Sequence, residues 1–312
     1  MLHVTNGEAT RGPLEQSGLP GTAMSWDDVL HEGPIVLAAG ENWYRVRAAY
    51  LASDRGISED QLLRDFREQG DRLAAAASHD EVVFWFEHDL HDQLLLIHHL
   101  WWLSRPEAPR TRYSIVIGTD YLGLLRPPQF PAKFASRRPI TPEDLAAGAA
   151  AWTTFCGDDP RLWVPFARDA GPLVFLPRAM HRLLEELPAA SNGLARSERQ
   201  LLEVLSEGPR PPEQAFVAAS RLEEDIWMGD STFWTIVTRL AAGPHPLLTV
   251  VRDEPTRLAS GTVTITGAGR QVLAGRADHV ALNAPSRGIG GTRLSPGQDW
   301  RWTGSSVQRA AP

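Results

Sequence analysis

The chain has 312 residues, of which 43% are hydrophobic and 22% are charged, so we expect about two globular domains. The formal net charge of −7 excludes the general basic surface on which nucleic-acid binding usually depends. The single cysteine, Cys156, excludes an intrachain disulfide, and we expect it to be a small core side chain.

The first residues carry no charged leader followed by an apolar stretch, so no signal peptide is expected. No apolar run approaches the roughly 18 residues of a membrane span, because His98 and His99 interrupt the longest one. We therefore expect a cytoplasmic protein without a membrane partner. The oligomeric state stays open.

The first third of the chain alternates strands and helices, which predicts an α/β domain with a Rossmann-like parallel sheet over residues 1–123. The continuous apolar run EVVFWF is typical of a central parallel strand. Strands are expected over 2–5, 22–26, 81–86 and 113–117, and helices over 8–17, 41–54, 58–77 and 88–103.

Residues 124–193 are expected to be a Pro-rich connector and helical segment, with helices over 141–155 and 177–187 and a domain boundary at 188–193. Residues 194–302 have the layout of a winged-helix domain, in which three helices precede a two-stranded ribbon. Those helices are expected over 197–206, 213–225 and 230–242. Residues 303–312 are expected to be a flexible tail.

Small or polar residues follow each predicted strand of the first domain. They are Asn6 and Gly7, then Asp27 and Asp28, then Glu87, His88 and Asp89, and finally Thr119 and Asp120. Ligands of open parallel α/β sheets sit beyond the carboxyl ends of the strands, so we expect these residues to line one small-molecule site. The alternative is that the acidic residues only cap the helices that follow.

The segment after the third strand, EHDLHDQ, is the richest in reactive side chains. Glu87, His88 and Asp89 are candidate catalytic residues, and Asp92 and Gln93 are candidate ligand-binding residues. At helical spacing, Glu87, His88, His91 and His98 share one face, which can bind zinc or a similar divalent ion. The carboxylates can also hold Mg²⁺ through a substrate phosphate, and the cofactor stays unknown.

The loop sequence DVLHEGP supplies two further candidates. His31 is a candidate general acid or base because imidazole titrates near neutral pH, and Glu32 is a candidate ligand-binding residue. A solvated loop histidine is the alternative. The chain has no P-loop and no dinucleotide fingerprint, so a phosphate would rest on the helix N-terminus after Asn6 and Gly7. Candidates for contact with an anion are Arg45, Arg47, Arg137 and Arg138.

The stretches LHVTNGEA, WDDVLHEGP and VVFWFEHDLHDQLLLIHHL resemble a bacterial family of domains of unknown function, DUF1835. The resemblance covers the first third of the chain, and LPRAMHRLLEELP, LARSERQLLEVL and GRADHVALN resemble the tails of longer members. It implies a bacterial intracellular protein and no established activity. It marks as motif positions Asn6, Gly7, Asp27, Asp28, His31, Glu32, Gly33, Pro34, Glu87, His88, Asp89, Asp92 and Gln93.

Three functions are compatible with these features. The first is binding or processing of a small phosphorylated or nucleotide-like ligand, and whether a reaction follows stays open. The second is a metabolite-sensing regulator whose winged helix binds DNA. It ranks lower because residues 194–312 carry 13 Arg against 12 Asp and Glu, and helix 230–242 has only Arg239. The third is a non-catalytic scaffold that contacts other proteins.

Overall fold

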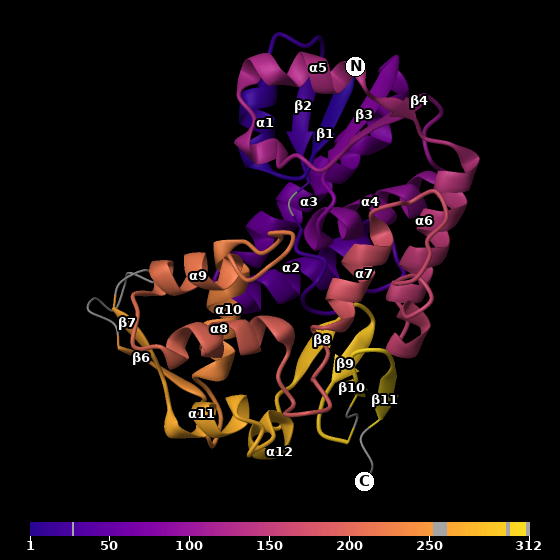
Figure 1. Cartoon of the computed structure of the whole chain (residues 1–312). Coiled ribbons are helices and arrows are strands. Elements are labelled where there is room, and N and C mark those ends of the chain that lie inside the picture. The colour runs from indigo at the N-terminus through magenta and orange to yellow at the C-terminus, as the bar shows by residue number, and fades with distance from the viewer. Residues whose placement is uncertain (27, 252–260, 298–299, 310–312) are drawn as a thin grey trace. The chain divides into compact units, whose positions relative to one another are not determined.

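The computed structural model describes residues 1–26, 28–251, 261–297 and 300–309, and the chain forms two compact units (Figure 1). The first unit comprises Met1–Met180 with Ile289–Thr292, and the second unit comprises His181–Gly288 with the chain from Arg293 onward. The division therefore falls within helix α7 (Leu176–Leu184). Segment 188–193, where the sequence suggested a boundary, lies inside the second unit.

The first unit is built on a five-stranded sheet of order β2-β1-β3-β4-β5, which confirms the expected mixed α/β fold. The first four strands are parallel, and β5 (Arg138–Pro139) is antiparallel to β4. All six residues of β3 are buried, as its apolar sequence requires of a central strand. The parallel strands are β1 (Leu2–Thr5), β2 (Thr22–Ser25), β3 (Glu81–Phe86) and β4 (Arg112–Ile117).

Helices cover both faces of this sheet (Figure 1). On one face, α1 (Glu8–Glu15) and α5 (Phe130–Ala135) supply Leu14 and Phe130 to a core that contains Val83 and Trp85. On the other face, His99 of α4 (Leu90–Leu103) packs on Phe84 and Phe86. Alternate side chains of β3 point to opposite faces of the sheet and pack into these two cores. Neither face of the strand is therefore left to water-exposed polar residues. The remaining long helices are α2 (Glu41–Arg55), α3 (Glu59–Ala74) and α6 (Pro142–Phe155).

His98 lies in an aromatic core. Its ring stacks on Trp43 of α2 with centroids 4.8 Å apart, and it lies 4.7 Å from Trp152 of α6 and 5.7 Å from Trp26. Burial lowers the pKa of His98 well below its usual value. The sequence grouped His98 with Glu87 on one helix face, but these contacts make it a neutral core residue.

Cys156 follows α6 and is half-buried. Burial raises the pKa of its thiol to about 12, so the reactive thiolate is scarce at neutral pH. This environment agrees with the expectation that Cys156 is a small core side chain.

The second unit begins with helices α8 (Arg196–Ser206), α9 (Pro212–Ser220) and α10 (Asp230–Leu240). The antiparallel pair β6 (Leu248–Val251) and β7 (Thr262–Ile265) follows. Two short helices, α11 (Gly267–Leu273) and α12 (His279–Asn283), come next. The pair β8 (Arg287–Ile289) and β9 (Thr292–Leu294) follows along the chain, and its residues 289–292 are grouped with the first unit.

The end of the described chain is a strand. Val307–Arg309 (β11) pairs antiparallel with Trp300–Trp302 (β10), and Val307 buries its side chain together with both tryptophans. The flexible tail expected over 303–312 is therefore wrong for residues 307–309, since a strand of three residues is too short to show an alternating pattern. Residues 310–312 lie outside the described chain.

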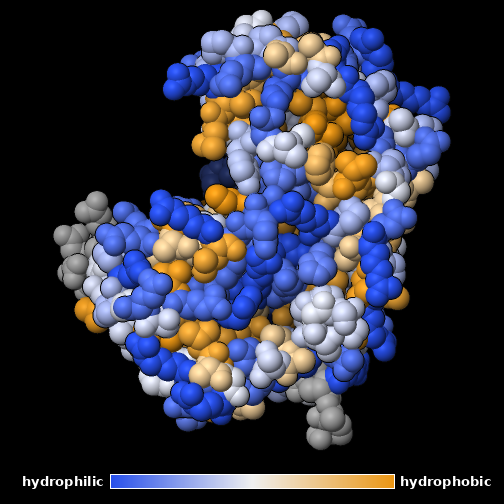
Figure 2. Space-filling model, viewed as in Figure 1, coloured by the Kyte–Doolittle hydropathy of each residue, from blue (hydrophilic) through white to orange (hydrophobic). Residues whose placement is uncertain are grey.

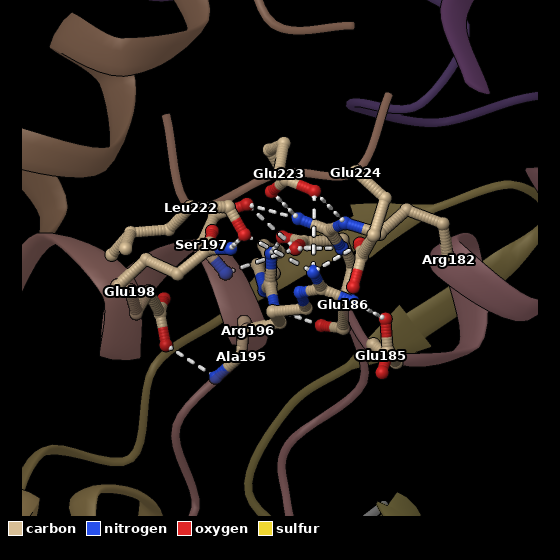
Figure 3. Close-up of polar contacts among 12 residues, drawn as sticks. Arg182, Glu185, Glu186, Ala195, Arg196, Ser197, Glu198, Leu222, Glu223 and Glu224 are labelled. Atoms are coloured by element: carbon tan, nitrogen blue, oxygen red, sulfur yellow. Dashed lines mark hydrogen bonds and ion pairs between the residues drawn. The ribbon is translucent and has the colours of Figure 1, made fainter. Parts of the chain in front are cut away.

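Buried ion pairs join the helices of the second unit (Figure 3). The Arg182 guanidinium donates to Glu186 at 2.8 Å and to both carboxylate oxygens of Glu223, at 2.6 and 2.8 Å. Arg196 donates to Glu185 at 2.7 Å and also pairs with Glu224. The network thus ties α7 to α8 and to the chain that follows α9.

The face drawn in Figure 2 is mostly hydrophilic, with separate hydrophobic patches. Large apolar side chains exposed by at least 60% include Leu124, Val174 and Val251. Among the described residues, no helix is both long and apolar enough to cross a membrane.

Candidate functional site

The ends of β1 and β3 lie side by side at the carboxyl edge of the parallel strands. Thr5 pairs with Trp85, so Asn6 and Glu87 leave the sheet next to one another. Strand β1 pairs with β2 on one side and with β3 on the other, and the strand order reverses here. In open α/β sheets this reversal opens the crevice in which ligands bind.

A side-chain network joins these two strand ends. Asn6 Nδ2 donates to Glu87 Oε1 at 3.1 Å and to Asp92 Oδ2 at 3.0 Å. Thr10 Oγ1 donates to Asn6 Oδ1 at 2.7 Å, which turns the amide nitrogen toward the two carboxylates. Glu87 Oε1 also accepts the Leu122 backbone N–H at 2.7 Å. The structure therefore brings together Asn6, Glu87 and Asp92 of the predicted site.

Helix α4 begins at the same place. Asp89 is its N-cap and accepts the Asp92 N–H at 3.2 Å, so the capping role weighed for Asp89 is present. Asp92 Oδ1 accepts the Glu87 N–H at 2.8 Å. Gln93 Nε2 donates to the Glu87 carbonyl at 2.6 Å, and the buried Gln93 amide oxygen accepts no hydrogen bond from any described residue.

Glu87, Asp89 and Asp92 form what we term the carboxylate cluster. All three are buried, and one oxygen from each lies within 4.8 Å of the others. Burial raises the pKa of Glu87 and, together with the charges of Asp89 and Glu87, raises that of Asp92 well above its usual range. A bound proton or cation relieves this repulsion. Oxygen ligands at this spacing suit a hard divalent cation.

Two histidines lie next to this cluster. His91, in the first turn of α4, interacts with the Asn6 backbone, and burial lowers the pKa of the His91 imidazole. The ring of His31 lies 6.0 Å from that of His91 between centroids. The loop that carries His31 therefore reaches the edge of the site. His88 directly follows Glu87 in the chain, and its ring centroid lies 5.3 Å from that of Tyr121.

Asp28 is part of a buried ion pair. Arg47 donates to its carboxylate three times, at 2.7 to 3.0 Å, and both side chains are fully buried. Arg47 also donates to the carbonyls of Glu32 and Pro34, so it fixes the loop that carries His31. The structure thus gives Asp28 a structural partner. The Glu32 carboxylate lies 3.4 Å from Arg55, and Asp27 lies outside the described residues.

The residues after β4 do not join the carboxylate cluster. Thr119 and Asp120 are exposed, and Asp120 pairs with Lys133 of α5. The arginines considered for anion contact also have carboxylate partners, in the pairs Arg45–Glu41, Arg47–Asp28, Arg137–Glu81 and Arg138–Asp144.

Two aromatic residues that the sequence did not mark lie beside the site. Tyr121 directly precedes Leu122, and Phe175 has its ring centroid 6.1 Å from that of His88. Both are half-buried. Only the aromatic character of Tyr121, one residue beyond the expected strand-end segment, could have indicated it. Phe175 is too distant in sequence to be found by such reasoning.

Comparisons with known proteins give no family. Neither a family model nor a curated protein matches the chain. A solved structure of the Plasmodium falciparum topoisomerase II DNA-binding, cleavage and re-ligation domain matches 86% of this chain at 12% identity, with a TM-score of 0.43. The match covers 47% of that chain, about half of its length. A likeness this weak supports no inference about fold or function.

Proposed function

We propose that the carboxylate cluster binds a divalent cation, and that the cation holds a small phosphorylated, nucleotide-like ligand at the carboxyl edge of the sheet. The observation that carries the proposal is the burial of three carboxylates within 4.8 Å of one another at the strand-order reversal. Three carboxylates this close repel one another when charged, and a bound cation relieves that repulsion.

The proposal gives each neighbouring residue a role. Asn6 orients Glu87 and Asp92 through its amide nitrogen, and the N-terminus of α1 after Gly7 offers backbone N–H groups to a phosphate. Mg²⁺ needs only one or two carboxylates when substrate phosphates complete its shell. His31 and His88 are the residues positioned to move a proton if the ligand is processed. We also propose that the first unit is a Rossmann-like domain of DUF1835 type.

The DNA-binding alternative is weaker. We propose that α8, α9, α10 and the β6–β7 pair make up a winged-helix-like region. Arg239, the one arginine of α10, lies 2.9 Å from buried Glu198 and is 18% exposed. An arginine held this way is not available to neutralise DNA phosphates.

Calorimetric titration with Mn²⁺ tests the proposed site. The wild-type chain should bind one Mn²⁺, and Glu87→Gln should weaken it at least tenfold because a charged ligand is lost. Asp89→Ser should weaken it as much while keeping a side chain that caps α4. The control is Asp80→Asn, an exposed acid that directly precedes β3 and lies away from the cluster. Affinity that is equal in all four proteins would refute the site.

Binding should also strengthen as the pH rises. Because the folded-state pKa values of Glu87 and Asp92 are raised, the cluster binds protons above the usual carboxylate range, and Mn²⁺ must displace them. Titrations in two buffers of different ionisation enthalpy should reveal proton release on Mn²⁺ binding. Glu87→Gln should release fewer protons.

A further inference from the structure

Tyr121 and Phe175 form what we term the aromatic wall. Their rings flank His88, with centroid distances of 5.3 and 6.1 Å. Both residues are half-buried, so neither is enclosed in the core. Aromatic rings that are partly exposed beside a polar site are the usual platforms for planar ligands.

The aromatic wall is continuous with the carboxylate cluster. The residue after Tyr121 donates its backbone N–H to Glu87 at 2.7 Å, and His88 directly follows Glu87 in the chain. Tyr121 is therefore one residue away from a backbone contact of Glu87, and His88 is one residue away from Glu87 itself. The buried amide oxygen of Gln93, which accepts no hydrogen bond among described residues, offers an acceptor at the same strand end.

We infer that the aromatic wall is the stacking subsite for a nucleobase, and that the ligand is a nucleoside phosphate rather than a sugar phosphate. This inference rests on the proposed function. The cluster and its cation hold the phosphates, and the base stacks on Tyr121 or Phe175. Stacking on an aromatic ring accepts any base, because every base presents a flat π-face. The subsite therefore selects for a planar ring without selecting a particular base.

Calorimetry at saturating Mn²⁺ with ADP, ribose 5-phosphate and pyrophosphate tests this inference. ADP should bind at least tenfold more tightly than ribose 5-phosphate. Tyr121→Ala and Phe175→Ala should each weaken ADP about tenfold, the size typical of losing one base–aromatic stack, and leave pyrophosphate unchanged. Tyr121→Phe should keep the ADP affinity because it keeps the ring. Leu124→Ala, a change at an 81% exposed residue nearby, is the control.

The outcomes separate the two proposals. Equal affinities for ADP and ribose 5-phosphate, or equal weakening of ADP and pyrophosphate by Tyr121→Ala, would overturn the stacking subsite and leave the cation-dependent phosphate site standing. If none of the three compounds binds to the Mn²⁺-loaded protein, both proposals fail. If Tyr121→Ala melts far below the wild type, the ADP and pyrophosphate affinities of Phe175→Ala take the place of those of Tyr121→Ala in this test.

Discussion

Arg47→Met should destabilise the first unit by about 3–5 kcal/mol, the typical cost of removing one partner from a buried ion pair. The substitution leaves the Asp28 carboxylate fully buried without its guanidinium. It also removes the donor to the carbonyls of Glu32 and Pro34. Native-state hydrogen exchange of the β3 amides should report the loss, because those amides open with the core of this unit.

Two further variants serve as controls for Arg47→Met. Arg45→Met removes an exposed arginine from the same helix and should change stability by no more than about 0.5 kcal/mol. Adding Asp28→Asn to Arg47→Met should recover part of the loss, since the uncompensated charge is gone. A loss below about 1 kcal/mol for Arg47→Met would mean that water reaches Asp28 and that the loop is not fixed as described.

Arg182→Met should destabilise the second unit by a similar amount, about 3–5 kcal/mol. The guanidinium serves two buried carboxylates, Glu186 and Glu223, and also donates to Ser197 Oγ at 2.9 Å. Hydrogen exchange of the α8 amides measures the effect. Arg199→Met, which breaks only the exposed pair with Glu203, is the control and should be nearly neutral.

The same network predicts an acid-sensitive second unit. Burial alone would raise the pKa of Glu186, but the charges of Arg182 and Arg287 outweigh it and hold the pKa below the usual 4.5. A lowered folded-state pKa stabilises the protein above about pH 4.5, and the contribution is lost as the pH falls toward the folded value. Between neutral and acid pH, Arg182→Met should lose less stability than the wild type does. An unchanged pH profile would contradict this role of Arg182.

The strands and several helix starts could be predicted because their signals are local. The apolar runs at Leu2–Thr5 and Glu81–Phe86 coincide with β1 and β3. Helices were expected to start at 58 and 141, and Ser58 and Thr141 do cap α3 and α6 by accepting the N–H three residues on. Strands of two or three residues, such as β5 and β11, are too short to show alternation and could not be predicted.

Features that depend on distant partners could not be read from local patterns. A helix was expected to begin at Ser197, but α8 already begins at Arg196, and Ser197 Oγ donates to Glu186 at 2.7 Å. Asp28 was expected to be a strand-end ligand. Its actual partner, Arg47, lies 19 residues away in the sequence, so no local pattern could indicate the pair.

The site was predicted in part. Asn6 and Glu87 were expected to converge because parallel strands end at one sheet edge, and their side chains do form a hydrogen bond. Asp28 and Asp120, expected at the same site, instead pair with Arg47 and Lys133. The aromatic wall was missed because Phe175 comes from a segment with no recognisable strand-end position.

The melting temperature of Glu87→Gln with and without Mn²⁺ tests whether the carboxylate cluster binds a cation. The glutamine keeps an oxygen for the Leu122 and Asn6 donors while removing one buried charge, so without Mn²⁺ the variant should melt at or above the wild-type temperature. Mn²⁺ should raise the melting temperature of the wild type, and at the same Mn²⁺ concentration it should raise that of the variant less because the variant binds more weakly. Destabilisation of Glu87→Gln by about 1–3 kcal/mol with an undiminished response to Mn²⁺ would contradict the account, because Glu87 would then be only a structural hydrogen-bond acceptor.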